Sequence, residues 1–95
     1  MTEKLLKDIA DHYGAQHQTL KLAEEASELS AAAIRFAQAR TRSDYTAELN
    51  HLIEEAADTL VLISQFAYHY RCEEKLKAMG DHKIRRTIKR MENDK

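Results

Sequence analysis

Two acidic stretches decide the fold and the chemistry of this chain: KLAEEASEL at residues 21–29 and HLIEEAADTLVLI at residues 51–63. Each stretch carries two carboxylates three positions apart: Glu25 with Glu28, and Glu55 with Asp58. On an α-helix, residues three apart lie on one face, roughly 5–6 Å apart at Cβ. Each stretch therefore presents two carboxylates in one direction, at the margin of an apolar stripe.

The composition around these stretches favours an all-α fold. The 95 residues include no proline and two glycines, and strong helix formers such as alanine, leucine and glutamate dominate. Apolar residues recur at helical spacing in four stretches, which we delimit as residues 2–13, 16–39, 45–70 and 73–91. We expect one four-helix-bundle-like, oligomeric domain that covers residues 1–95.

Capping residues set the expected helix ends. Thr2 is a candidate N-cap of the first helix, and Gly14 is a C-terminal stop. Ser43 or Asp44 is expected to cap the third helix. Gly80 lies within the last stretch, where it either breaks the helix or is tolerated.

The two central helices carry long apolar stripes that we expect to form the core. The members are Leu22, Ala26, Leu29, Ala33, Phe36 and Ala37, then Leu49, Leu52, Ala56, Leu60, Ile63, Ala67 and Tyr70. A short polar connection at residues 40–43 makes these helices antiparallel neighbours. A hairpin that turns near residue 42 places residues 28 and 55 at the same level.

Facing each other, the two pairs put four negative charges into one small volume. Asp58 in particular is followed by an apolar run, and burying its charge unpaired would cost several kcal/mol. A divalent cation relieves this repulsion, and carboxylate oxygens suit Mg²⁺ or Mn²⁺. The alternative is a solvated acidic face with ion pairs along each helix, which Glu24, Glu48 and Glu54 fit well.

The order Glu24-Glu25-x-x-Glu28, a spacer of 26 residues, and Glu55-x-x-Asp58 resembles the signature of the MazG-type all-α nucleoside triphosphate pyrophosphohydrolases. The resemblance implies an oligomeric helical bundle, either a dimer or a tetramer. It implies that Glu25, Glu28, Glu55 and Asp58 bind Mg²⁺ and that a nucleoside triphosphate is cleaved between its α and β phosphates. Glu24 matches the first acid of the motif. It is expected either to support the metal ligands from behind or to be a surface residue of the helix.

The roles of the remaining candidates follow from helical spacing. Glu25 lies one turn from Glu28 and faces the hairpin, so we assign it as the general base for water. Two further sets are candidates for substrate binding: Gln18 and Lys21 on the strip with Glu25, and Lys83, Arg86 and Arg90 on the last helix. If Lys21 does not bind substrate, it is expected to form an ordinary ion pair with Glu25. If Lys83, Arg86 and Arg90 do not bind substrate, they are expected to form a solvated basic face or to pair with the acidic helices.

Charge and cysteine content limit the remaining classes of function. The net charge is −1, so we do not expect nucleic acid as a partner, although the basic last helix keeps that reading open. Cys72 is the single cysteine, which points to a reducing cytoplasmic location. The longest apolar run, residues 60–63, is too short to span a membrane, and no apolar signal core precedes it.

Two other functions stay open beside the nucleoside triphosphate pyrophosphohydrolase. One is phosphoribosyl-ATP pyrophosphohydrolase, whose helices and acid pairs are similar. The other is a non-catalytic helical interaction module, in which the acids only keep the surface soluble. The EEASEL and EEAADTLVLI segments favour the MazG pattern, and the enzyme would then clear non-standard or excess nucleotides.

Overall fold

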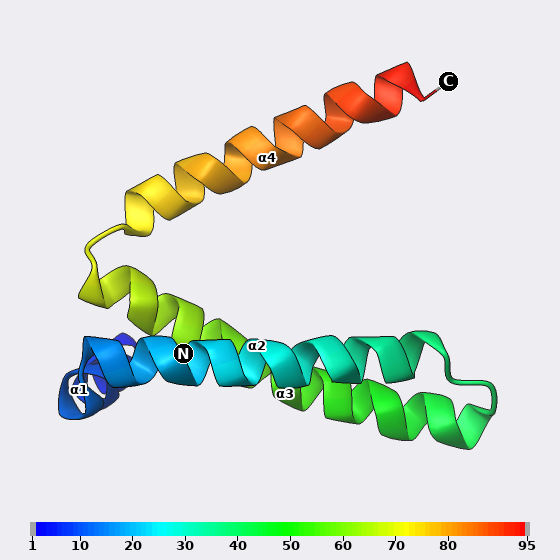
Figure 1. Ribbon diagram of the computed structural model, residues 1–95, viewed down its shortest axis with the longest axis horizontal. Helices are drawn as coiled ribbons and strands as arrows, with labels where there is room; N and C mark the ends of the chain where they lie inside the picture. Colours follow the sequence, from blue (N-terminus) through cyan, green and yellow to red (C-terminus); the bar gives the residue numbers. More distant parts are fainter. Residues whose placement is uncertain (1, 95) are drawn as a thin grey trace.

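The computed structural model describes residues 2–94 and contains four α-helices (Figure 1). They are α1 (Glu3–Tyr13), α2 (Ala15–Ala37), α3 (Arg42–His69) and α4 (Glu73–Asn93). The described residues form no strand, so the all-α prediction is confirmed. Gly80 lies inside α4 without interrupting it.

The centre of the molecule is the α2–α3 pair, two long helices that lie side by side (Figure 1). Residues 38–41 connect α2 to α3, and polar contacts join the two helices. The Thr59 hydroxyl on α3 lies 3.4 Å from the carbonyl oxygen of Glu25 on α2. The first helix, α1, packs against both near the start of α2, where Gln65 Nε2 donates to the Leu6 carbonyl at 3.2 Å. These contacts hold the middle of α2 at the level of the middle of α3.

The helix ends differ from the prediction at α3. Thr41 is the N-cap, because its hydroxyl oxygen accepts from the Asp44 backbone N–H at 3.0 Å. The prediction of Ser43 or Asp44 as the cap is therefore wrong, and α3 begins at Arg42 rather than at Tyr45. Gly14 separates α1 from α2 as expected, with a φ of 88° that glycine adopts without strain.

The core is small and contains several polar side chains. The buried residues are Leu6, Ala10, Gln18, Glu25, Ala32, Thr59, Leu62, Gln65 and Ala67. On α3, Ala67 is buried as predicted, but Leu60 is 56% exposed, and Leu62, outside the predicted stripe, is 7% exposed. The predicted core position of Leu60 was therefore wrong. The reason is that α3 carries apolar residues on two opposite sides, and periodicity alone does not say which side meets α2. Five other members of the predicted stripes are likewise exposed: Ala26, Ala33, Ala37, Ala56 and Tyr70.

The last helix, α4, extends away from the other three (Figure 1). It contacts α3 alone and has no buried residue. The radius of gyration is accordingly 16.5 Å, whereas a compact chain of this length has about 12 Å. Within one chain, α4 therefore does not pack alongside the α2–α3 pair. None of the helices in residues 2–94 has the length and apolar content that crossing a bilayer needs.

Candidate functional site

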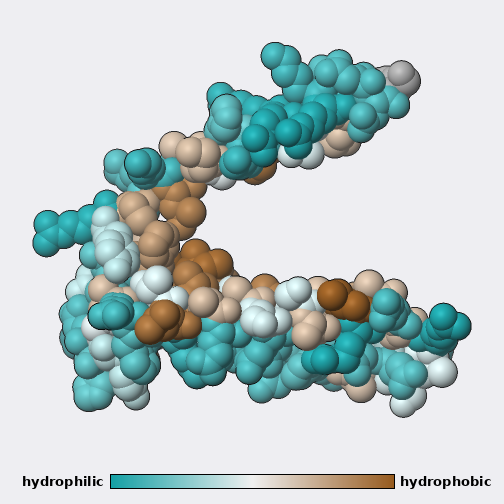
Figure 2. Space-filling view, viewed as in Figure 1, coloured by the Kyte–Doolittle hydropathy of each residue, from teal (hydrophilic) through white to brown (hydrophobic). Residues whose placement is uncertain are grey.

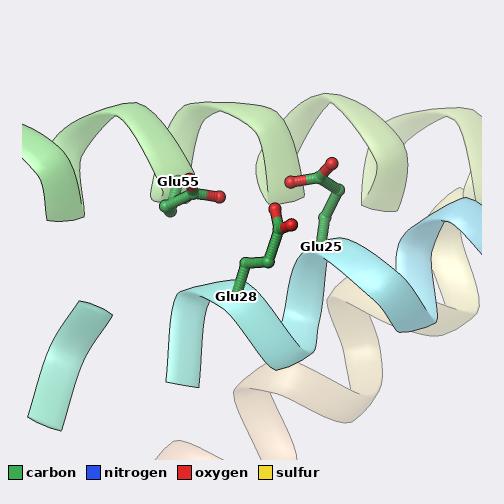
Figure 3. A group of neighbouring side chains, drawn as sticks. All are labelled: Glu25, Glu28 and Glu55. Atoms are coloured by element: carbon green, nitrogen blue, oxygen red, sulfur yellow. The ribbon is translucent and has the colours of Figure 1, made fainter. Parts of the chain in front are cut away.

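Three glutamates from the α2–α3 pair meet at the centre of the molecule. Figure 3 shows Glu25 and Glu28 of α2 and Glu55 of α3 directing their carboxylates toward one another. One carboxylate oxygen from each residue lies within 4.8 Å of the other two. The expected match in level between residues 28 and 55 is thus present. This three-glutamate cluster is where the structure concentrates negative charge.

The cluster is partly withdrawn from water. Glu25 is 9% exposed, Glu55 is half-buried and Glu28 is exposed. The Oε2 atoms of Glu25 and Glu55 are buried and accept no hydrogen bond. Buried oxygens that carry charge require a proton, a cation or a donor. The negative charge on these two oxygens is therefore not compensated by a hydrogen bond from the protein, and a proton or a bound cation could compensate it.

Two basic side chains stand near the other oxygens of these carboxylates. Lys21 Nζ lies 3.8 Å from Oε1 of Glu25 and 3.5 Å from Oε1 of Glu24. His51 Nε2 lies 3.9 Å from Oε1 of Glu55. The Lys21 contact with Glu25 is long and half-exposed, so it neutralises the outer oxygen of that carboxylate weakly. Neither basic side chain reaches the buried Oε2 atoms.

The crowding of carboxylates changes the acidity of Glu25. A hydrogen bond with the Glu28 carboxyl raises the pKa of Glu25 above its usual value of 4.5. Burial and the charges of Glu28 and Asp58 raise this pKa further, while Lys21 opposes the shift. A proton or a metal ion therefore binds here more readily than at an isolated carboxylate.

Asp58 occupies a different position from the one its sequence context suggested. It is exposed, and it stands outside the close cluster of three. Its side chain is solvent-accessible although Leu62, one turn further along the same face of α3, is buried. Asp58 nevertheless lines a cavity of about 550 Å³ together with Glu24, Glu25, Lys21 and Gln18. It is therefore a carboxylate at the rim of the site.

Gln18 is buried and already hydrogen-bonded within the protein. Its Nε2 donates to Oε1 of Gln65 at 2.7 Å, and its Oε1 lies 2.7 Å from Nδ1 of His17. His17 in turn stacks on Tyr13, with ring centroids 4.9 Å apart. These residues form one wall of the cavity beside the glutamates. Gln18 thus fixes the wall, in addition to any contact with a ligand.

Two residues that the sequence reasoning did not select support the site. Gln65 is 1% exposed and links Gln18 to the backbone of α1. Thr59 is buried between the helices, and its hydroxyl donates to the Glu55 carbonyl at 2.9 Å. A signal was available, because Asp58, Leu62 and Gln65 follow the i, i+4, i+7 spacing of one helical face.

The basic candidates of the last helix lie apart from the glutamates. Lys83, Arg86 and Arg90 are exposed on α4, and no ion pair among residues 2–94 joins α4 to another helix. Glu24 is exposed and paired with Lys21, which fits its alternative as a surface residue. The structure brings together Glu25, Glu28 and Glu55, places Lys21 and Asp58 beside them, and leaves the basic set outside.

Comparison with protein-family models, with curated proteins and with solved structures finds no match to this chain. The chemistry of the site therefore depends on its own residues. What they offer is a set of oxygen ligands from two helices, two buried unpaired carboxylate oxygens, and an adjoining cavity with a lysine at its edge.

Proposed function

We propose that this chain is a Mg²⁺-dependent nucleoside triphosphate pyrophosphohydrolase of the MazG-like all-α superfamily. It would add water across the α–β phosphoanhydride bond and release a nucleoside monophosphate and pyrophosphate. The observation that carries the proposal is the three-glutamate cluster, with its two buried and unpaired Oε2 atoms. A role in clearing unwanted nucleotides follows from the resemblance.

The ligand set fits a hard divalent cation. Glu25, Glu28 and Glu55 offer oxygen atoms alone, which suits Mg²⁺ and also Mn²⁺. Asp58 would complete the set from the rim of the cavity. When bound, such an ion neutralises phosphate charge and lowers the pKa of a coordinated water.

The protein's own residues have separate tasks in this proposal. Glu25 accepts the proton of the attacking water, and its raised pKa brings it closer to the range of an efficient base at neutral pH. Lys21 offers its ammonium group to the phosphates at the edge of the cavity. The stacked Tyr13 and His17 rings form an aromatic surface on which a nucleobase can lie.

The proposal includes an assembly. The α2–α3 pair is taken as an antiparallel hairpin that becomes part of a bundle in a cytoplasmic homo-oligomer. Lys83, Arg86 and Arg90 then approach the phosphates from a neighbouring subunit, because α4 extends away from the glutamates of its own chain.

The decisive experiment supplies Mg²⁺ with a panel of ribonucleoside and deoxyribonucleoside triphosphates, and with phosphoribosyl-ATP. Pyrophosphate and orthophosphate are measured separately. We expect pyrophosphate and monophosphate in equal amounts. Orthophosphate as the sole product contradicts the proposed bond cleavage, and turnover of phosphoribosyl-ATP alone assigns the chain to that substrate instead.

Site variants connect this activity with the cluster. Glu28→Gln and Glu55→Gln each remove the charge of a proposed ligand, so we expect turnover to fall by about 100-fold or more. Glu54→Gln is the matched control, because Glu54 is exposed and lies outside the cluster. Equal turnover in all three variants would separate the activity from this site.

Metal binding is tested independently of turnover. Added Mg²⁺ raises the melting temperature of the wild-type chain by binding linkage, and this rise is lost in Glu55→Gln. The non-catalytic interaction module predicts the opposite result: an unchanged melting temperature with Mg²⁺, and an Asp58→Asn variant as stable as the wild type.

A further inference from the structure

The last helix carries an apolar face that nothing in the chain covers. Its apolar stripe consists of Leu76, Met79, Ile84, Ile88 and Met91, whose exposed fractions range from 42% to 61%. Arg85 and Lys89 lie on the opposite side, by helical spacing. A helix with one apolar and one basic face normally buries the apolar one. In this chain the apolar face of α4 meets solvent along its whole length.

The third helix carries a second apolar face with the same property. Ile53 and Leu60 are 57% and 56% exposed, and they lie one above the other at i, i+7. Leu62 and Thr59, which are buried toward α2, lie on the other side of the same helix. A helix that is apolar on opposite sides is buried on both in a stable assembly. The α2–α3 pair covers one side of α3 alone.

The two uncovered faces adjoin each other. Leu60 and Ile63 of α3 and Leu76 of α4 line one cavity of about 550 Å³, at the point where α4 leaves α3. Figure 2 shows apolar side chains along the inner sides of the angle between α4 and the rest of the molecule. The apolar stripe of α4 and the outer face of α3 therefore form one continuous surface, which we call the α3–α4 surface.

The amount of exposed surface fits a missing subunit. The chain exposes 7656 Å² for a mass of 11.0 kDa. A folded monomer of this mass exposes about 5,600 Å², so the excess is roughly 2,000 Å². A stable interface removes about 800 Å² from each partner. The excess is thus more than enough for a dimer interface.

Charge complementarity also favours a second copy of this chain as the partner. Residues 82–90 of α4 hold five basic side chains and no acid. The exposed acids Glu24, Glu28, Glu54 and Asp58 lie on the α2–α3 pair, and among residues 2–94 no ion pair joins them to α4 of the same chain. A second copy of this chain supplies both the complementary charge and a matching apolar face.

We propose that a second copy of this chain covers the α3–α4 surface in a two-fold dimer. Each α4 lies along α3 of the other protomer and buries its apolar stripe on the outer face there. Lys83, Arg86 and Arg90 flank that stripe and come to the acidic edge of the opposite protomer. The inference specifies the homo-oligomer of the proposed function, but its test measures mass rather than turnover, so either can fail without the other.

The test is the mass of the full chain in solution, measured by sedimentation or light scattering over a dilution series. The wild-type chain is expected at twice its 11.0 kDa mass. The double variant Ile84→Ser with Ile88→Ser removes two apolar side chains from the stripe, and we expect its dimer affinity to fall by about 100-fold or more. The matched control is Arg85→Ser with Lys89→Ser, which also introduces two serines four residues apart, but on the opposite face of α4. It should alter the affinity by less than about 3-fold.

Two further readouts keep the result clear. Circular dichroism should show that both double variants keep their helix content. Amide hydrogen exchange of α4 should slow as the wild-type concentration rises, because α4 is protected by the partner alone. A wild-type chain that is monomeric throughout, or an oligomer whose mass the isoleucine variant does not lower, overturns the proposal. The same holds if the control variant weakens association equally.

Discussion

The part of the chain formed by α1, α2 and α3 differs from α4 in how its polar and apolar groups are satisfied. In the first part, the Gln18 amide bonds to Gln65, and Gln65 bonds to the Leu6 backbone, so polar groups reach deep into the core. In α4 no residue is buried, and its five large apolar side chains are exposed. Both parts show clear helical periodicity. Periodicity therefore predicts that a helix forms, but not whether its apolar face is covered by the same chain.

The largest expected effect comes from truncating a buried leucine. Leu62→Ala opens a cavity between α2 and α3, so we expect the free energy of unfolding to fall by about 2–5 kcal/mol. Ile88→Ala on α4 removes a side chain that is half exposed, and its effect should stay below about 0.5 kcal/mol in dilute protein. Urea unfolding at low concentration measures both values.

The same pair of variants also tests the dimer. When the protein is concentrated, Ile88→Ala should become more destabilising, because its side chain is then buried by the partner. Equal costs for the two variants in dilute protein would mean that α4 packs within its own chain, and the contrast between the two parts would disappear.

The sequence predicted four helices in nearly the right places because composition and periodicity act locally. The start of α3 was misplaced because Thr41 caps it, and a threonine beside Ser43 and Asp44 gives no unique signal. Leu60 of α3 was wrongly assigned to the core because Leu60 and Leu62 are equally apolar. The choice between them depends on contacts with α2, which a single helix does not encode.

The candidate site was predictable to the extent that it depends on helical geometry. The levels of Glu28 and Glu55 follow from helix rise and a short connection, and the structure brings these residues together with Glu25. The exposure of Asp58 was not predictable, because it depends on the orientation of α3 about its own axis. Gln65 was overlooked because a glutamine in an apolar run has no specific chemical signature.

The second expected effect concerns this buried glutamine. Gln65→Leu leaves the Gln18 amide and the Leu6 carbonyl without their partner, so we expect a loss of about 1–3 kcal/mol in unfolding free energy. Gln16→Leu is the matched control, because Gln16 is exposed on α2. Chemical denaturation compares the two. A Gln65→Leu variant as stable as the wild type would show that the polar link is dispensable and that α1 is held by apolar contacts alone.

The smallest expected effect is a dependence of stability on pH that originates at Glu25. Folding raises the pKa of Glu25 above its usual 4.5, so the folded chain binds a proton there more readily than the unfolded chain does. Without metal, the carboxylate therefore destabilises the fold increasingly as the pH rises from 4.5 through the folded pKa, and constantly above it. Glu25→Gln removes this charge and keeps a group that can hydrogen-bond to Glu28. We expect the variant to melt at a higher temperature than the wild type at pH 7 in the presence of a chelator, and at a similar temperature below pH 4.

Added Mg²⁺ should reverse this order at pH 7, because the ion stabilises the ionised carboxylate in the wild type and loses a ligand in the variant. Glu92→Gln on α4 serves as the comparison, since Glu92 is exposed and lies far along the chain from the cluster. Its melting temperature should follow that of the wild type at both pH values, with and without the ion. If Glu25→Gln lowers the melting temperature in chelator at pH 7, the carboxylate is stabilised by the protein itself. The unpaired oxygens would then not be a site prepared for a cation, and the difference between the centre of the molecule and α4 would be one of packing alone.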